Sequence, residues 1–128
     1  MTDAIVLFAH GSRDSRWAAP FQAIRDRVTA AAGGRPVRLA FLEMMSPGLV
    51  EAIAEIAATG ARAVLVVPLF LGQGGHLRED LPRLVREAEA RHPGVAIRLA
   101  GAAGEAPGVL DALSAYCVAV ATDANPGD

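Results

Sequence analysis

The sequence predicts an α/β domain built on a small parallel sheet of four strands, with helices on both faces. Two observations predict this class. Four short apolar segments alternate with segments of helical spacing along the 128 residues, as in repeated strand–helix–strand units with right-handed crossovers. The apolar segments are continuous, which is typical of strands that helices cover on both sides. For so few units, the expected strand order is the flavodoxin-like 2-1-3-4.

The first strand–helix unit occupies roughly the first quarter of the chain. Residues 4–9 (AIVLFA) form an uninterrupted apolar run and predict a buried strand. A helix is expected from Trp17 to about Ala32, and the glycine pair at 33–34 ends it. The apolar residues that should form the inner face of this helix are Phe21, Ile24 and Val28.

The second unit begins with an expected strand at Val37–Leu42. Ser46 is predicted to cap the following helix, because its hydroxyl can accept a hydrogen bond from the first turn. Pro47 would then occupy the first helical position, where a proline is well tolerated. Gly60 is expected to end this helix.

The third unit contains the most apolar predicted strand, Ala63–Leu71. Pro68 has no N–H to donate, so regular strand pairing should break near it. A glycine-rich segment at 72–75 then leads into a helix expected from about Asp80 to Arg91. Pro82 would lie in the first turn of that helix, where it costs little.

The last unit is an expected strand at Val95–Leu99 followed by a helix from Pro107 to about Ala121. The only cysteine, Cys117, lies in this helical pattern and is predicted to be a buried, inert thiol. Residues 1–121 are expected to form a single domain. The polar segment 122–128 is expected to be a disordered tail.

Composition excludes several classes of partner and cofactor. The net charge of −2 provides no broad positive field for nucleic acid. The longest apolar run is too short to cross a bilayer and no basic leader precedes the first strand, so we expect a cytoplasmic protein without a membrane partner. All 12 cationic residues are arginines, and the absence of lysine excludes a Walker A loop. Leu77 stands where a dinucleotide fingerprint needs its third glycine, so no nucleotide is expected.

Three polar residues follow the first three predicted strands. His10 comes directly after the first strand, Glu43 after the second, and His76 after the third and its glycines. Because the carboxyl ends of parallel strands meet at one edge of a sheet, these residues should share that edge. Two imidazoles and a carboxylate suit a divalent first-row ion with positions left open for a substrate. Each residue also has a plainer interpretation, as a hydrogen-bonded loop histidine or as a capping or solvated glutamate.

Other residues near these positions are ambiguous. Gly11 and Gly75 each flank a candidate ligand and would let a flat ligand approach the backbone closely, although ordinary turn chemistry explains them almost as well. His92 precedes Pro93 at a predicted helix end, away from the edge. We interpret it as a favourable C-terminal cation or a solvated residue.

The segments VLFAHGSRD, FLEMMSP and VVPLFLGQGGHLREDLP resemble the small sirohydrochlorin chelatases, which are single-domain class II metal chelatases. The resemblance extends from about Ile5 to Ala100. It implies a lyase that inserts Co²⁺ for cobalamin, Fe²⁺ for sirohaem or Ni²⁺ for the methanogen cofactor, without ATP. It also implies that His10 and His76 bind the metal as substrate and that Glu43 assists. The presence of only three histidines disfavours nickel, because nickel-using members often carry a histidine-rich insertion.

The resemblance has further implications for substrate binding and assembly. The tetrapyrrole carries eight carboxylates, so Arg13 and Arg78 are candidate bidentate clamps; the alternative is that they pair with local acids such as Asp14 or Glu79. Longer relatives contain two such domains, which favours a homodimer here. The competing function is a non-catalytic carrier of the metal or the tetrapyrrole. A flavodoxin-like receiver or nucleotide-binding domain is disfavoured, because the required acidic residues are missing after the first and third strands.

Overall fold

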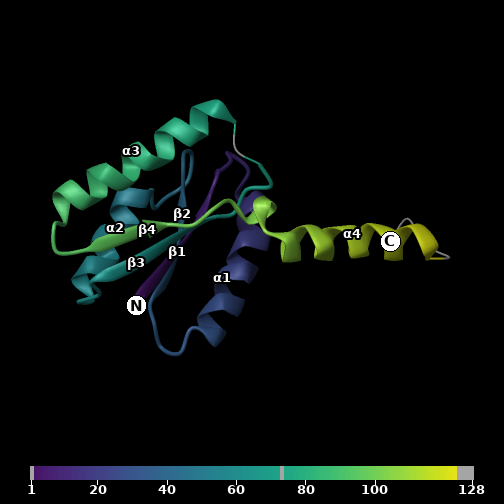
Figure 1. Cartoon of the computed structure of the whole chain (residues 1–128), viewed down its shortest axis with the longest axis horizontal. Coiled ribbons are helices and arrows are strands. Elements are labelled where there is room, and N and C mark those ends of the chain that lie inside the picture. The colour runs from purple at the N-terminus through teal and green to yellow at the C-terminus, as the bar shows by residue number, and fades with distance from the viewer. Residues whose placement is uncertain (1, 73, 124–128) are drawn as a thin grey trace.

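The computed structural model describes residues 2–72 and 74–123, apart from the side chain of His76. Four parallel strands form one sheet in the order β2-β1-β3-β4, so the predicted fold class and strand order are confirmed. Figure 1 shows the sheet between α2 and α3 on one side and α1 on the other. In chain order, the strands and α-helices are β1 (Ala4–Ala9), α1 (Ala19–Ala31), β2 (Val37–Phe41), α2 (Leu49–Ala58), β3 (Ala63–Pro68), α3 (Gly75–Arg91), β4 (Ala96–Leu99) and α4 (Pro107–Thr122).

The larger part of the core lies between the sheet and the pair α2 and α3. Alternate residues of β1 and β3, among them Phe8 and Val66, point to this side and are fully buried. Ile53 of α2 and Leu81 of α3 are equally buried against them. Strand β3 ends at Pro68, three residues before the predicted end at Leu71, and Pro68 pairs with Phe8 in the last register position. The predicted break in regular pairing near this proline is confirmed. This packing fixes the ends of the strands from which the candidate site is built.

The opposite side of the sheet is covered less completely. A short 3-10 turn, η1 (Ser15–Ala18), and α1 pack over β1 and β2, with Phe21 and Val28 half-buried. No described residue of α1 is fully buried, and Ile24, which was predicted to face inward, is 39% exposed. The prediction for Ile24 is therefore wrong. Helix α1 lies over only part of the sheet, and within the described part of the chain no second helix makes extensive contact with it.

Two predicted helix starts are also wrong. The residue that caps α2 is Gly48, whose N–H donates to the Glu51 carboxylate at 3.3 Å, and Ser46 is not helical. The reason is that the preceding segment first pairs with the sheet: the Phe41 N–H donates to the Pro47 carbonyl at 2.9 Å. The backbone of residue 47 therefore pairs with β2, and helix α2 can begin only after residue 47.

Helix α3 starts five residues earlier than predicted, at Gly75. The Arg78 N–H donates to the Gly74 carbonyl at 3.1 Å, which closes the first turn inside the glycine-rich segment. Pro82 consequently lies within the helix, where it removes one backbone hydrogen bond to the carbonyl of residue 78. The early start places His76 in the first turn of α3.

Helix α4 extends away from the rest of the molecule (Figure 1). It packs mainly against η2 (Ala103–Glu105), the 3-10 turn before it. Cys117 is exposed, so its predicted burial is wrong: the helical pattern exists, but no described segment covers it. The helix includes Thr122, the first residue of the predicted tail, and residues 124–128 lie outside the described part. None of the described helices combines the length and apolarity needed to span a bilayer.

Candidate functional site

His10 and Glu43 lie at the same edge of the sheet, as predicted. His10 follows the last residue of β1, and Glu43 lies two residues beyond β2. Backbone hydrogen bonds continue past the ends of both strands: the Leu42 N–H donates to the Ala9 carbonyl at 2.9 Å, and the Glu43 N–H donates to the His10 carbonyl at 3.1 Å. The two loops are therefore held side by side by the main chain.

The side chains of the two residues also meet. His10 Nε2 lies 3.2 Å from Glu43 Oε1, and the side chains are 54% and 51% exposed. An ion pair with this exposure contributes little to stability. The His10 ring also packs edge-on against the ring of Phe70, with ring centroids 6.4 Å apart. An imidazole and a carboxylate that solvent can reach, at hydrogen-bond distance, can share a proton or hold a cation.

The pair opens into a cavity of about 480 Å³ at the carboxyl edge of the sheet. Its volume is in the range of small-molecule sites, and one side is open to solvent. Two leucines and one phenylalanine form the apolar part of the wall, and one histidine and two acidic residues form the polar part. The lining residues are His10, Leu42, Glu43, Phe70, Gly72, Gly74, Leu77 and Asp80.

The second predicted ligand, His76, is the second residue of α3, and its side chain lies outside the described part of the structure. Its backbone lies between Gly74 and Leu77, both of which line the cavity. Among the described side chains, no group of three or more histidines, cysteines or acids is close enough to hold a metal ion. The meeting of His10 with His76 therefore stays a prediction.

Asp80 is a cavity residue that sequence reasoning missed. It lines the cavity from α3, and Arg83 approaches its carboxylate to 3.5 Å. Position 80 is one helical turn after position 76, and residues four apart share a face of a helix. The sequence contains this spacing, but the helix was predicted to begin at about Asp80. Positions 76 and 80 were therefore not expected to share a helical face.

The two predicted glycines differ in their surroundings. Gly11 has φ +100°, and a Cβ there would overlap the backbone carbonyl of Glu43. Its missing side chain thus allows the close approach of the two loops. A Cβ at Gly75 would meet nothing within 4 Å. Neither residue lines the cavity; Gly72 and Gly74 do.

Gly11→Ala is expected to lower the free energy of unfolding by about 2–5 kcal/mol, the sum of the left-handed backbone cost and the steric overlap. Gly60 is the matched control, because it has a similar φ of +89° and open space around its Cβ position. Gly60→Ala should cost only about 1–2 kcal/mol. Urea denaturation of both variants measures the difference. Equal losses would contradict the close packing of Gly11 on Glu43.

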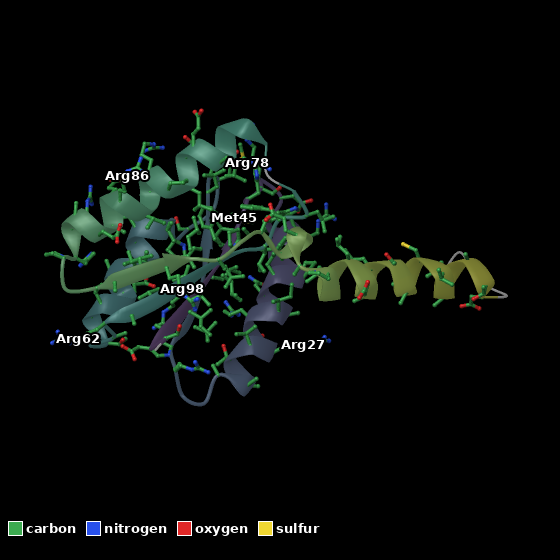
Figure 2. The ribbon with its side chains drawn as sticks, viewed as in Figure 1. Arg27, Met45, Arg62, Arg78, Arg86 and Arg98 are labelled. Atoms are coloured by element: carbon green, nitrogen blue, oxygen red, sulfur yellow. The ribbon has the colours of Figure 1, made fainter. Side chains whose placement is uncertain are left out.

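The two predicted arginine clamps are exposed. Arg13 and Arg78 form no ion pair with any residue that the structure describes, so pairing with local acids does not account for them. Asp14 is held instead by Arg16, with Nη2 and Oδ2 2.9 Å apart. This hydrogen bond lowers the pKa of Asp14, which keeps its carboxylate charged and paired with Arg16. Figure 2 shows Arg78 at the N-terminal end of α3, the end near the cavity.

His92 lies where it was predicted, at the end of α3 away from the cavity. It is the C-terminal cap of that helix, and its N–H donates to the Ala88 carbonyl at 2.9 Å. It does not contribute to the cavity wall. His92 is therefore a suitable control for substitutions at the site.

Known proteins match this chain both in sequence and in fold. The sequence model of the CbiX family matches residues 4–117. A sirohydrochlorin cobaltochelatase of Methanothermobacter thermautotrophicus is 33% identical over 91 residues, which cover 69% of this chain and 63% of that protein. The chain thus matches less than two thirds of this curated relative's length.

Solved structures of a CbiX protein and of SirB have the same fold as this chain. A CbiX protein of cobalamin biosynthesis from Marinobacter aquaeolei superposes with a TM-score of 0.80 and 34% identity, covering 91% of this chain and 94% of that one. The sirohydrochlorin chelatase SirB of Bacillus subtilis subspecies spizizenii, in complex with cobalt, superposes with a TM-score of 0.75 and 28% identity. The match covers 93% of this chain but 51% of SirB.

Proposed function

The chain belongs to the CbiX family, and we propose that it inserts a divalent metal ion into sirohydrochlorin without ATP. Cobalt is the first candidate metal and Fe²⁺ the second, for cobalamin or sirohaem biosynthesis in the cytoplasm. The observation that supports this function most directly is the His10–Glu43 pair, 3.2 Å apart in an open cavity with apolar walls. Such a pair can hold a cation and accept a proton at the same place.

The proposed reaction exchanges one metal ion for two protons. The M²⁺ ion loses its water ligands and the two pyrrolic N–H groups lose their protons, so that four ring nitrogens can bind the metal. In this proposal neutral His10, together with His76, holds the ion in a labile site. Glu43 accepts one pyrrolic proton as a general base. The second proton passes to the imidazole that the metal has left, or to water.

The surroundings of the pair suit a flat, polyanionic ring. Leu42, Phe70 and Leu77 offer apolar surface to the macrocycle, and glycines at 72 and 74 leave room for its approach. Arg13 and Arg78 would bind carboxylates at the rim of the ring, because guanidinium groups bind carboxylates with two parallel hydrogen bonds. Their lack of ion pairs with described residues leaves them available for this role.

The cobalt preference comes from relatives. The relative from Methanothermobacter is named a cobaltochelatase, and the SirB structure is a complex with cobalt. Imidazole and carboxylate donors also suit Co²⁺ and Fe²⁺. A tetrapyrrole is larger than the cavity of about 480 Å³, so we further propose that two copies of the chain together enclose the substrate.

Multiple-turnover metallation tests catalysis against the competing function of carriage. Sirohydrochlorin in tenfold excess over protein is mixed anaerobically with Co²⁺, and cobalt sirohydrochlorin is followed by absorbance, with the protein-free rate subtracted. We expect product to pass one equivalent per chain and to increase linearly with protein concentration. A reaction that stops at one equivalent would identify a carrier and refute the proposed enzyme.

A further inference from the structure

Two large hydrophobic side chains are exposed beside the candidate site. Outside α4, Met44 and Leu71 are the large hydrophobic residues of the described chain that are more than half exposed, at 56% and 70%. Met44 directly follows Glu43, and Leu71 lies between Phe70 and Gly72. Because neighbouring Cα atoms are about 3.8 Å apart, both residues lie at the rim of the cavity that their neighbours line. A single exposed apolar side chain is ordinary, but two at the rim of one cavity indicate a ligand with an apolar surface.

The backbone at Met44 holds this side chain in solvent at a conformational cost. Met44 has φ +65°, and no other described non-glycine residue has a positive φ. This left-handed conformation is unfavourable for residues with a Cβ, so it persists where neighbouring contacts fix it, often at functional sites. Here the Glu43 N–H donates to the His10 carbonyl, and Met45 packs half-buried into the core on the α1 side. Met44 is thus held between two fixed residues with its own side chain exposed.

The backbone of Leu71 is also fixed, although its side chain is the more exposed of the two. The Gly104 N–H in η2 donates to the Phe70 carbonyl at 2.8 Å, and a Cβ at Gly104 would overlap the backbone of Leu71. The buried Gly104 therefore packs directly on this segment. Both rim residues are presented to solvent by an anchored backbone, as in a binding surface that is formed before its ligand arrives.

The strand order places the two rim residues on opposite sides of His10. Met44 follows β2, His10 follows β1 and Leu71 follows β3. Strand β1 lies between β2 and β3 in the sheet. Two strand spacings correspond to roughly 10 Å. One flat ligand that lies over His10 can therefore extend to both rim residues.

We propose that Met44 and Leu71 bind the tetrapyrrole macrocycle where it extends beyond the cavity. This inference rests on the proposed function, because it concerns the substrate of the same site. The ring is larger than the cavity of about 480 Å³, so part of it must lie past the rim, where these two side chains offer apolar surface. The flexible, polarisable side chain of methionine suits contact with a conjugated ring. The apolar ring surface would leave water on binding, which supplies the free energy of the contact.

Titration of metal-free sirohydrochlorin with the full-length protein, followed by fluorescence, tests this contact without requiring catalysis. Met44→Gln and Leu71→Asn keep the approximate size of each side chain but make it polar. Each should raise the dissociation constant of the ring about tenfold, which corresponds to about 1.4 kcal/mol of lost apolar burial. The double variant should raise it about 100-fold, since the residues lie on separate loops. Ile24→Gln is the matched control: Ile24 is 39% exposed on α1 and is not part of the cavity wall, so its dissociation constant should not change.

Two further measurements separate substrate binding from other roles. In turnover assays the rim variants should raise the KM for sirohydrochlorin and leave the KM for Co²⁺ unchanged, because they do not touch the metal. Met44→Gly should have a Tm equal to or above that of wild type, since glycine adopts φ +65° without strain. The same variant should bind the ring about tenfold more weakly. A lower Tm at unchanged ring affinity would mean that Met44 serves only the fold, and would overturn the inference.

Unchanged ring affinity in the double variant, or an equal loss of affinity in Ile24→Gln, would also overturn the inference. So would rim variants that change the sedimentation of the protein but not its ring affinity, because the rim would then be a contact between protein chains. Failure of the proposed function gives a different result. A wild type that binds the ring, and loses affinity in the rim variants, but stops at one equivalent of cobalt sirohydrochlorin would refute the enzyme and support the rim contact.

Discussion

Co²⁺ insertion into sirohydrochlorin should fall by about 100-fold or more in the variant His10→Ala, while the fold stays intact. The methyl group of alanine cannot bind the ion or accept a proton, so the substitution removes the nitrogen that lies beside Glu43. Stability should change by less than about 1 kcal/mol, because the imidazole is 54% exposed and exposed ion pairs contribute little. Initial rates under anaerobic conditions and a thermal denaturation curve measure the two effects.

Two further variants complete this experiment. His92→Ala removes an imidazole from the opposite end of α3 and should leave the rate unchanged. His76→Ala should lower the rate as strongly as His10→Ala if the second imidazole shares the metal. Turnover that is unchanged in both the His10 and the His76 variants would refute the metal site. A loss of turnover in the His10 variant alone would mean that His76 does not bind the metal and that the site consists of His10 and Glu43.

The fold, and the placement of His10 beside Glu43 in the candidate site, could be predicted from the sequence because they depend on local patterns. Continuous apolar runs such as 4–9 fix the strands, and right-handed crossovers then leave few possible topologies. Parallel strands place the residues that follow them at one edge. This rule alone predicted that His10 and Glu43 lie together, which the distance of 3.2 Å confirms.

The errors occurred where tertiary contacts override local signals. Ser46 is a good capping residue, but the backbone of Pro47 pairs with β2 and delays the helix. Pro82 favours a nearby helix start, but the first turn of α3 forms earlier, through the hydrogen bond to the Gly74 carbonyl. Because the helix start was predicted too late, Asp80 was not recognised as a cavity residue. Cys117 was predicted to be buried from an apolar pattern. Burial requires a segment that packs over the helix, and no described segment covers Cys117.

Glu43→Gln should lower the turnover number for Co²⁺ insertion by about 10²- to 10⁴-fold, which is the usual contribution of a general base. Glutamine keeps the size of the side chain and can still donate or accept a hydrogen bond at the His10 ring, but it cannot take up a pyrrolic proton. The KM for Co²⁺ should change only a few-fold, because the imidazole is retained. Steady-state rates at varied Co²⁺ concentration separate the two parameters.

Glu55→Gln is the control for removing a carboxylate of similar exposure. Glu55 lies on α2 and is 54% exposed, close to the 51% of Glu43, and it also faces a cation, Arg38, at 3.6 Å. It is not part of the cavity wall, so its variant should keep full activity. If Glu43→Gln instead raises the KM for Co²⁺ strongly at an unchanged turnover number, the carboxylate binds the metal and is not the base. The pyrrolic proton would then have to pass to His10. Among the described side chains of the cavity wall, His10 is a titratable one that directly contacts Glu43.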